Sequence, residues 1–305
     1  MGNHLTGECS KCNSIEKQDI TCPSHPVALK LLNYCNIPLA APSANKFGHI
    51  SPTSVEHVLS EFPNDFMYII DGGTCDIGIE STVVKIDSDV STHSDYSTNY
   101  EELEAFVDAL SSSDYVDNSN QWKGLFEQIE RASSAKTLTI LRKGAVTQEM
   151  LKNSLGAKIF RDIRVEHKVA SLSSKSVCEA PGMLLRHYAP NVPTYRVCLE
   201  SDEGSNEVSA AEVVMIDIGG KLGAWRNHFM QYIETSDDSD ALAKQLYSLL
   251  RTAESLAMGG NNSIIAIHYE NKHGDMGEAI SDRLYRATSG KSIYCEVTDE
   301  ISFKW

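Results

Sequence analysis

The sequence predicts an α/β protein with two domains. Short apolar runs of strand length alternate with stretches of helical apolar spacing, first before the middle of the chain and again towards its end. A serine-rich stretch of low apolar content, residues 165–180, opens a linker between the two regions. The chain has 305 residues, with 41% hydrophobic and 23% charged, which is enough for two domains and a sizeable core. We therefore expect a polar tail at 1–19, a first domain at 20–164, a linker at 165–195 and a small second domain at 196–305.

Charge and hydropathy argue against several classes of protein. The formal net charge of −15 argues against a broad contact surface for nucleic acid, because phosphate contacts need clustered Lys and Arg. A local basic pocket for a nucleotide is compatible with that charge. No run of 18 apolar residues is present and no signal peptide is recognisable, so we expect a cytoplasmic protein without a membrane partner. The eight cysteines are scattered, and we expect them reduced and mostly buried.

The elements of the first domain can be predicted in chain order. Pro26 suits the first turn of a helix, and Thr147 is a good cap for a later one. An acidic segment at about 88–136 interrupts the alternation, and we expect a surface insertion there, with a docking element as the alternative. The expected ranges are a helix at 27–34, a helix at 51–62, strands at 66–73, 78–87 and 137–146, and a helix at 148–155.

The stretch from Pro38 to Thr53 predicts a strand that enters a ligand-binding loop. A short apolar run stops at Pro42, and small polar residues and Gly48 follow. Ser51 is a good helix N-cap and is followed by Pro52, so the free amides of a helix N-terminus would face the loop, where phosphate oxygens bind well. The alternative is that these residues form only a turn.

Two further groups of polar residues could bind a ligand or could have no function beyond solvation. Arg142 and Lys143 follow a strand, where α/β folds tend to place ligand contacts, but both side chains are equally compatible with a solvated position. Cys9-x-x-Cys12 with Cys22-x-x-His25 has a spacing that allows zinc, but we expect a mobile tail without metal and keep zinc as the alternative.

The second domain reads as a small α/β unit. Strands are expected at 212–220 and 263–268, and helices at 241–257 and 277–287, with Ile280, Leu284 and Ala287 on one side of the last helix. The arrangement is like half of a Rossmann fold, but no Gly-x-Gly-x-x-Gly accompanies it, so a dinucleotide is not expected.

A set of short motifs, each weak alone, occurs in a fixed order. They are Pro42-Ser43-Ala44-Asn45, Ser51-Pro52-Thr53, Asp71-Gly72-Gly73, Gly78-Ile79-Glu80-Ser81-Thr82-Val83-Val84, Leu141-Arg142-Lys143-Gly144, Pro181-Gly182-Met183 and His187-Tyr188-Ala189-Pro190. The ordered set resembles the threonylcarbamoyl-AMP synthase family of the two-domain type. The resemblance covers about 20–87 and 137–305, and it implies a partial YrdC-like twisted-sheet α/β domain, a linker and a small Rossmann-like α/β domain.

The resemblance implies a reaction and a set of site residues. L-threonine, bicarbonate and ATP, with Mg²⁺ on the phosphates, would give threonylcarbamoyl-AMP and pyrophosphate. A separate transferase would then use the product to modify tRNA, so that tRNA is only an indirect partner. By resemblance Ser43, Asn45, Ser51, Arg142 and Tyr188 would contact ATP, with Ser43 and Asn45 closest to the chemistry, while Ala41 and Ser81 would help to hold threonine. Positioning and charge neutralisation do most of the work in such a reaction, so no Ser-His-Asp nucleophile is needed.

The sequence departs from the family in one respect. In the family an N-terminal half precedes this stretch and ends in a Lys-x-Arg motif that faces Ser-x-Asn, and we expect this chain to lack it. Counting back from Pro26, the two cations fall at Asp19 and Thr21, so substrate anions would lose charge-assisted contacts there. Three hypotheses follow: a synthase, a nucleotide-binding partner protein of tRNA modification that cannot catalyse, or a truncated product without a stable catalytic fold.

Overall fold

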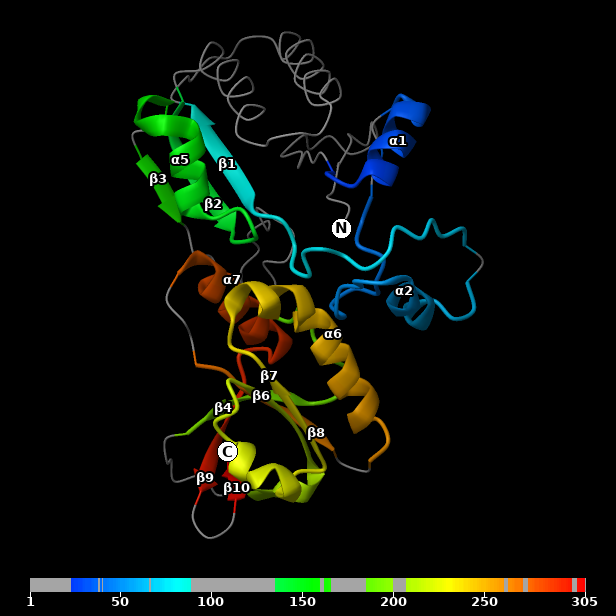
Figure 1. The fold of residues 1–305 in the computed structure, drawn as a ribbon, viewed down its shortest axis with the longest axis vertical. Helices are drawn as coiled ribbons and strands as arrows, with labels where there is room; N and C mark the ends of the chain where they lie inside the picture. The colour runs from blue at the N-terminus through cyan, green and yellow to red at the C-terminus, as the bar shows by residue number, and fades with distance from the viewer. Residues whose placement is uncertain are drawn as a thin grey trace. The chain divides into compact units, whose positions relative to one another are not determined.

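The computed structural model of the chain is an α/β structure with two sheets (Figure 1). It describes residues 23–37, 39, 41–65, 67–88, 135–159, 162–165, 185–199, 207–260, 263–270, 274–297 and 301–304. The predicted tail at 1–19, most of the acidic insertion and most of the predicted linker lie outside these ranges. The α/β prediction is confirmed.

Two compact units make up the chain. One contains the described residues of Ser43–Glu80 and of Val169–Trp305, and the other contains those of Gly2–Pro42 and of Ser81–Lys168. Residues 43–80, which the sequence assigns to the first domain, therefore group with the C-terminal residues. The sequence-based domain boundaries stay predictions.

The helices and strands have the following bounds. The helices are α1 (Pro26–Cys35), α2 (Val55–Glu61), α5 (Gln148–Ile159), α6 (Ser239–Ala257) and α7 (Asp275–Ala287), with short 3-10 helices η1 (Ala210–Glu212) and η2 (Gly223–His228). The strands are β1 (Val83–Ser88), β2 (Ala135–Arg142), β3 (Asp162–Val165), β4 (Thr194–Cys198), β5 (Glu207–Ser209), β6 (Val213–Ile218), β7 (Gln231–Thr235), β8 (Ile264–His268), β9 (Ser292–Val297) and β10 (Ile301–Lys304). None of these helices is both long enough and apolar enough to cross a bilayer.

The smaller sheet has the order β1-β2-β3, with β1 antiparallel and β3 parallel to β2. After β2 the chain turns into α5, and the amide of Met150 donates to the hydroxyl of Thr147 at 3.1 Å, which confirms the predicted cap. The predicted helix at 27–34 is also confirmed as α1, with Pro26 in its first turn.

The larger sheet belongs to the C-terminal residues and has the order β5-β10-β9-β4-β8-β6-β7. Strands β9, β4, β8, β6 and β7 are parallel, and β10 is antiparallel to both of its neighbours. Strands β6 and β8 are buried at every position, as expected for parallel strands that are covered on both faces. The strands and helices predicted for the second domain are confirmed as β6, α6, β8 and α7.

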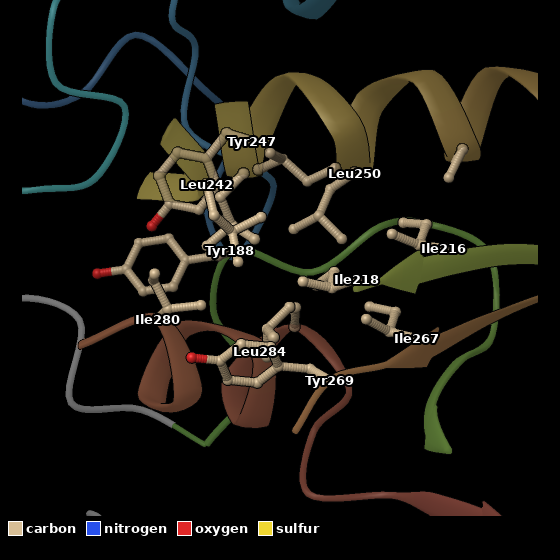
Figure 2. Packing of buried hydrophobic residues seen from close by; sticks show 14 of the residues in the cluster. Tyr188, Ile216, Ile218, Leu242, Tyr247, Leu250, Ile267, Tyr269, Ile280 and Leu284 are labelled. Carbon is tan, nitrogen blue, oxygen red and sulfur yellow. The ribbon is translucent and has the colours of Figure 1, made fainter. Parts of the chain in front are cut away.

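Alternate residues of the central strands feed two cores. Val214, Ile216 and Ile218 of β6 face α6 and α7 in one apolar cluster, which Figure 2 shows in part. Val213 and Met215 belong to a second cluster on the other face of the sheet. The first cluster also contains Ile50, Ile79 and Tyr188, so the segment 43–80 shares a core with the C-terminal helices.

Three predictions about local structure are wrong. Residues 67–73 form no strand, and Tyr68 and Ile70 are 91% and 63% exposed, because no described strand lies beside them to pair with. Ser51 is not a helix cap: α2 begins four residues later, and the amide of His57 donates to the hydroxyl of Ser54. The described cysteines are free, as expected, but of these only Cys295 is buried.

Candidate functional site

The Ser43–Ile50 loop is held in shape by Asn45. The amide of Asn45 donates to the carbonyl of Ser43 at 2.9 Å. Its side-chain amide group donates to the carbonyls of Lys46 at 2.9 Å and His49 at 3.3 Å. The loop turns at Gly48, which has a φ of +79° and whose carbonyl accepts a bond from the amide of Ala189 at 3.0 Å. The Asn45 side chain thus cross-links its own turn.

The remaining polar atom of Asn45 is the most informative atom of the loop. Its two backbone acceptors fix the side-chain NH₂ group toward the loop, so the other end of the amide must be the oxygen. That Oδ1 atom is buried and has no hydrogen-bond partner among the described residues. A buried acceptor without a partner costs stability, so this atom is suited to a donor supplied by a ligand.

Ser51 lies below the loop and is only 2% exposed. Its hydroxyl donates to Oε1 of Glu80 at 2.7 Å, while Oε2 of Glu80 accepts bonds from the hydroxyl of Tyr247 at 2.7 Å and from Nε of Arg283 at 3.3 Å. Burial, together with the Glu80 carboxylate, raises the pKa of Tyr247 well above its ordinary value, so the phenol stays a donor. The hydroxyl of Ser51 is therefore committed to a buried network.

Tyr188 belongs to the same part of the core and is 1% exposed, with a left-handed φ of +59°. Its ring lies 5.3 Å from that of Tyr247, and the guanidinium carbon of Arg283 lies 5.9 Å from its centre. Figure 2 shows Tyr188 between Tyr247 of α6 and Ile280 of α7. A strained backbone at a buried aromatic residue indicates that the surrounding packing fixes its position.

Ser81 and Arg142 meet in the other unit. Nε of Arg142, at the end of β2, donates to the carbonyl of Ser81 at 3.0 Å, and the hydroxyl of Thr82 donates to the carbonyl of Val146 at 2.6 Å. Ala41 is exposed in the loop that follows α1. The structure thus brings Ser43, Asn45, Ser51 and Tyr188 into one unit, and Ala41, Ser81 and Arg142 into the other.

The sequence alone assigns no role to several charged residues of this region. Glu80 lies inside the motif Gly78–Val84, and its position directly before Ser81 is the only sign in the sequence that it belongs to the site. Glu61, Arg251 and Arg283 lie on helices, where a charged residue ordinarily faces solvent, yet all three are buried. The partners in the ion pairs Glu61–Arg251 and Glu80–Arg283 lie 190 and 203 positions apart, so no local sequence pattern indicates these pairs.

The described residues hold no group of three His, Cys, Asp or Glu side chains that could bind a metal ion. Cys9, Cys12 and Cys22 of the zinc alternative lie outside the described residues, as do Asp19 and Thr21. His25 is described and has a structural task, because its Nδ1 accepts a bond from the amide of Val27 at 3.3 Å and caps α1.

Fold and loop together define an α/β protein in which a Ser-x-Asn loop is packed on a Rossmann-like C-terminal sheet and its helices. The family model described as "Telomere recombination" (Sua5_yciO_yrdC) matches residues 11–93. The model for the "Threonylcarbamoyl-AMP synthase, C-terminal domain" matches residues 146–289. The chain belongs to the threonylcarbamoyl-AMP synthase family, of the two-domain type.

Individual relatives agree with this assignment. The threonylcarbamoyl-AMP synthase of Bacillus subtilis is 25% identical over 92% of this chain and 65% of its own length. That of Pyrococcus abyssi is 26% identical over 90% of this chain and 64% of its own length. The crystal structure of P. abyssi Sua5 complexed with L-threonine superposes with a TM-score of 0.55 at 25% identity, covering 90% of this chain and 64% of that one. The chain thus spans about two thirds of the length of the relatives that it matches.

Proposed function

We propose that this protein is an L-threonylcarbamoyladenylate synthase, a nucleotidyltransferase that uses L-threonine, bicarbonate and ATP and releases pyrophosphate. The product would go to a separate transferase that forms threonylcarbamoyladenosine in tRNA. Membership of the synthase family supports the reaction, and the threonine held by the P. abyssi relative supports that substrate.

The observation that carries the proposal is the Oδ1 atom of Asn45. A buried acceptor without a protein partner, in the Ser-x-Asn loop of a synthase-family chain, suits a hydroxyl or amino donor of the nucleotide. Ser43 is exposed beside it and is free to approach phosphate oxygens. Ser51 and Tyr188 are the other proposed ATP contacts in this unit, and because both are buried they would line the ATP site behind this loop.

Three further residues are proposed as substrate contacts on the family resemblance. Arg142 is the proposed cation for the nucleotide, and Ser81 and Ala41 are the proposed threonine contacts. Mg²⁺ would enter with the phosphates, because this ion keeps several waters and needs few protein ligands. Adenylation then depends on alignment of the carbamate with the α-phosphate and on neutralisation of charge, which these side chains are suited to provide.

A nucleotide-binding protein without catalytic activity is the second candidate. It is favoured by Asp19 and Thr21, which stand where the family has a lysine and an arginine that would face the substrates. Loss of both cations would reduce the stabilisation of the transition state more than the affinity for ATP, since charge neutralisation is the main catalytic contribution.

Threonine-dependent release of pyrophosphate separates these candidates. We expect Asn45→Ala to lower kcat/KM by about 10- to 100-fold, the effect of losing one hydrogen bond to a charged or polarised ligand. Asn33→Ala, at an exposed position of α1, is the control and should leave the rate unchanged. ATP binding that depends on Asn45 without any release of pyrophosphate would support the second candidate, and no ATP binding at all would exclude both.

A further inference from the structure

We infer that Arg251 on α6 is a positioning residue for the Ser43–Ile50 loop and acts on it through Glu61 of α2. The C-terminal domain would then set the geometry of the candidate ATP site directly. The positioning itself rests on contacts in this structure, whereas its consequence for ATP rests on the function proposed above.

Arg251 connects α6 to the segment that carries the loop. Its Nη2 atom donates to Oε1 of Glu61 at 3.0 Å and also to the carbonyl of Ile50, at the end of the loop. Arg251 and Glu61 are 9% and 8% exposed. An ion pair that water barely reaches has a well-defined geometry, and breaking it leaves an uncompensated charge in the interior.

The second oxygen of Glu61 faces the loop. Oε2 accepts a bond from the amide of Lys46 at 3.1 Å and lies 3.2 Å from Nδ1 of His49. Burial alone would raise the pKa of Glu61, but the Lys46 amide and Arg251 lower it, so the carboxylate is charged at neutral pH. One carboxylate therefore bridges the arginine of α6 and two residues of the loop.

Those two residues are also the ones that fix Asn45. The side-chain amide of Asn45 donates to the carbonyls of Lys46 and His49, the residues that Glu61 holds from the other side. A shift of Glu61 would move both carbonyls and, with them, the direction of the Oδ1 atom. Arg251 thus fixes Asn45 through a chain of two hydrogen-bonded groups without contact with the nucleotide.

Hydrogen exchange of the backbone amides of Asn45, Lys46 and His49 in the full chain tests the inference. All three amides are hydrogen bonded within the loop or to Glu61. We expect Glu61→Gln and Arg251→Met to accelerate their exchange by about tenfold or more, since a charge-assisted bond is lost. Amides of β6 and β8 should keep the wild-type rate in both variants.

The matched control is Arg226→Met, which removes an exposed arginine of the same domain from its pair with Glu234 at 3.2 Å. This variant should not change the exchange rate of any of the three loop amides. If Arg251→Met also loosens β6 and β8, the variant is globally destabilised, and the decision passes to Glu61→Gln, which keeps the size of the side chain. Unchanged loop exchange in Glu61→Gln would overturn the inference.

Addition of ATP and Mg²⁺ separates positioning from a merely structural role. The ATP concentration that gives half-maximal protection of the loop should rise about tenfold in Glu61→Gln. In Arg251→Lys, which keeps both the positive charge and Glu61, it should stay close to the wild-type value. A loosened loop with unchanged ATP dependence would refute the positioning role. If ATP fails to protect the wild-type loop, the proposed function fails, while the difference in exchange without ATP still decides the link between Arg251 and the loop.

Discussion

Gly78 lies closer to the backbone of α6 than any side chain would permit. A Cβ atom at this position would lie 2.3 Å from the carbonyl oxygen of Lys244 and 2.5 Å from that of Ala243. Both are backbone atoms of a helix and cannot rotate away. The next residue, Ile79, is buried in the cluster below α6. This close approach places Glu80 within reach of Tyr247 and Arg283.

We therefore expect Gly78→Ala to lower the free energy of unfolding by about 1–3 kcal/mol, the usual cost of overpacking a filled core. Gly259→Ala is the control, because its nearest neighbour is the carbonyl oxygen of Leu256 at an ordinary 3.6 Å. Urea unfolding followed by tryptophan and tyrosine fluorescence gives both values. Equal stability of the two variants would show that the segment does not rest on α6 in solution.

Asp217 is a second buried acid, at the end of β6. It accepts bonds from the amide of Leu222 at 2.6 Å, from the hydroxyl of Tyr232 at 2.6 Å, and lies 2.8 Å from Nδ1 of His268. Burial alone would raise the pKa of Asp217, but these hydrogen-bonding groups outweigh burial and lower it. Burial and the hydrogen bond to this carboxylate raise the pKa of Tyr232.

Because the pKa of Asp217 is lower in the folded state than in the unfolded state, the free energy of unfolding depends on pH. The contribution of Asp217 is complete above the pKa of an unfolded aspartate, about 3.9, and is lost as the pH falls through the lower folded value. We expect Asp217→Asn to be less stable than wild type at pH 7, and the gap between the two to narrow below about pH 4. Thermal unfolding of both proteins between pH 2.5 and 7 measures it. A gap that stays constant over this range would contradict the assignment.

At the scale of elements, the sequence predicts best where the determining chemistry is local. Pro26 and Thr147 announce the helices that follow them, because a missing amide or a capping hydroxyl acts within one turn. The amphipathic spacing of α6 and the apolar runs of β6 and β8 are likewise set by the faces that they bury. These elements lie within a few residues of their predicted bounds.

Prediction fails where an element depends on a distant partner. Ser51 has the local appearance of a helix cap, but its hydroxyl bonds to Glu80, which lies 29 positions later, and Ser54 caps α2 instead. The apolar run Phe66–Gly73 has the composition of a strand. A strand also needs a neighbour for its backbone groups, and none of the described strands provides one.

The same distinction between local and distant contacts applies to the candidate site. The Ser-x-Asn loop could be selected from its motif, and the bonds of the Asn45 side chain within it join residues at most four positions apart. The support from Glu61 and Arg251 could not, since 190 positions separate the two residues. A charged residue on a helix predicts a surface position until the tertiary partner is known.

At the scale of the whole molecule, the distribution of charge bears on whether the chain can bind tRNA. The chain has 27 Lys and Arg against 42 Asp and Glu, for a net charge of −15. Among the described cations, Arg251 and Arg283 are buried against carboxylates, and Arg286 is paired with Asp282. These guanidinium groups are occupied inside the protein and do not build a basic surface.

We therefore expect no direct complex with tRNA. At a salt concentration of about 0.15 M, an electrophoretic mobility shift should show no bound tRNA at about 10 µM protein, because non-specific binding depends on clustered cations and on the counterions that they release. A basic tRNA-binding protein is the positive control. Binding that weakens linearly in log K with log salt would contradict the expectation and reveal a cationic surface on the chain. If the expectation holds and the proposed function is correct, the small-molecule product and not tRNA would pass to the next enzyme, which would have to supply the contacts to tRNA phosphates.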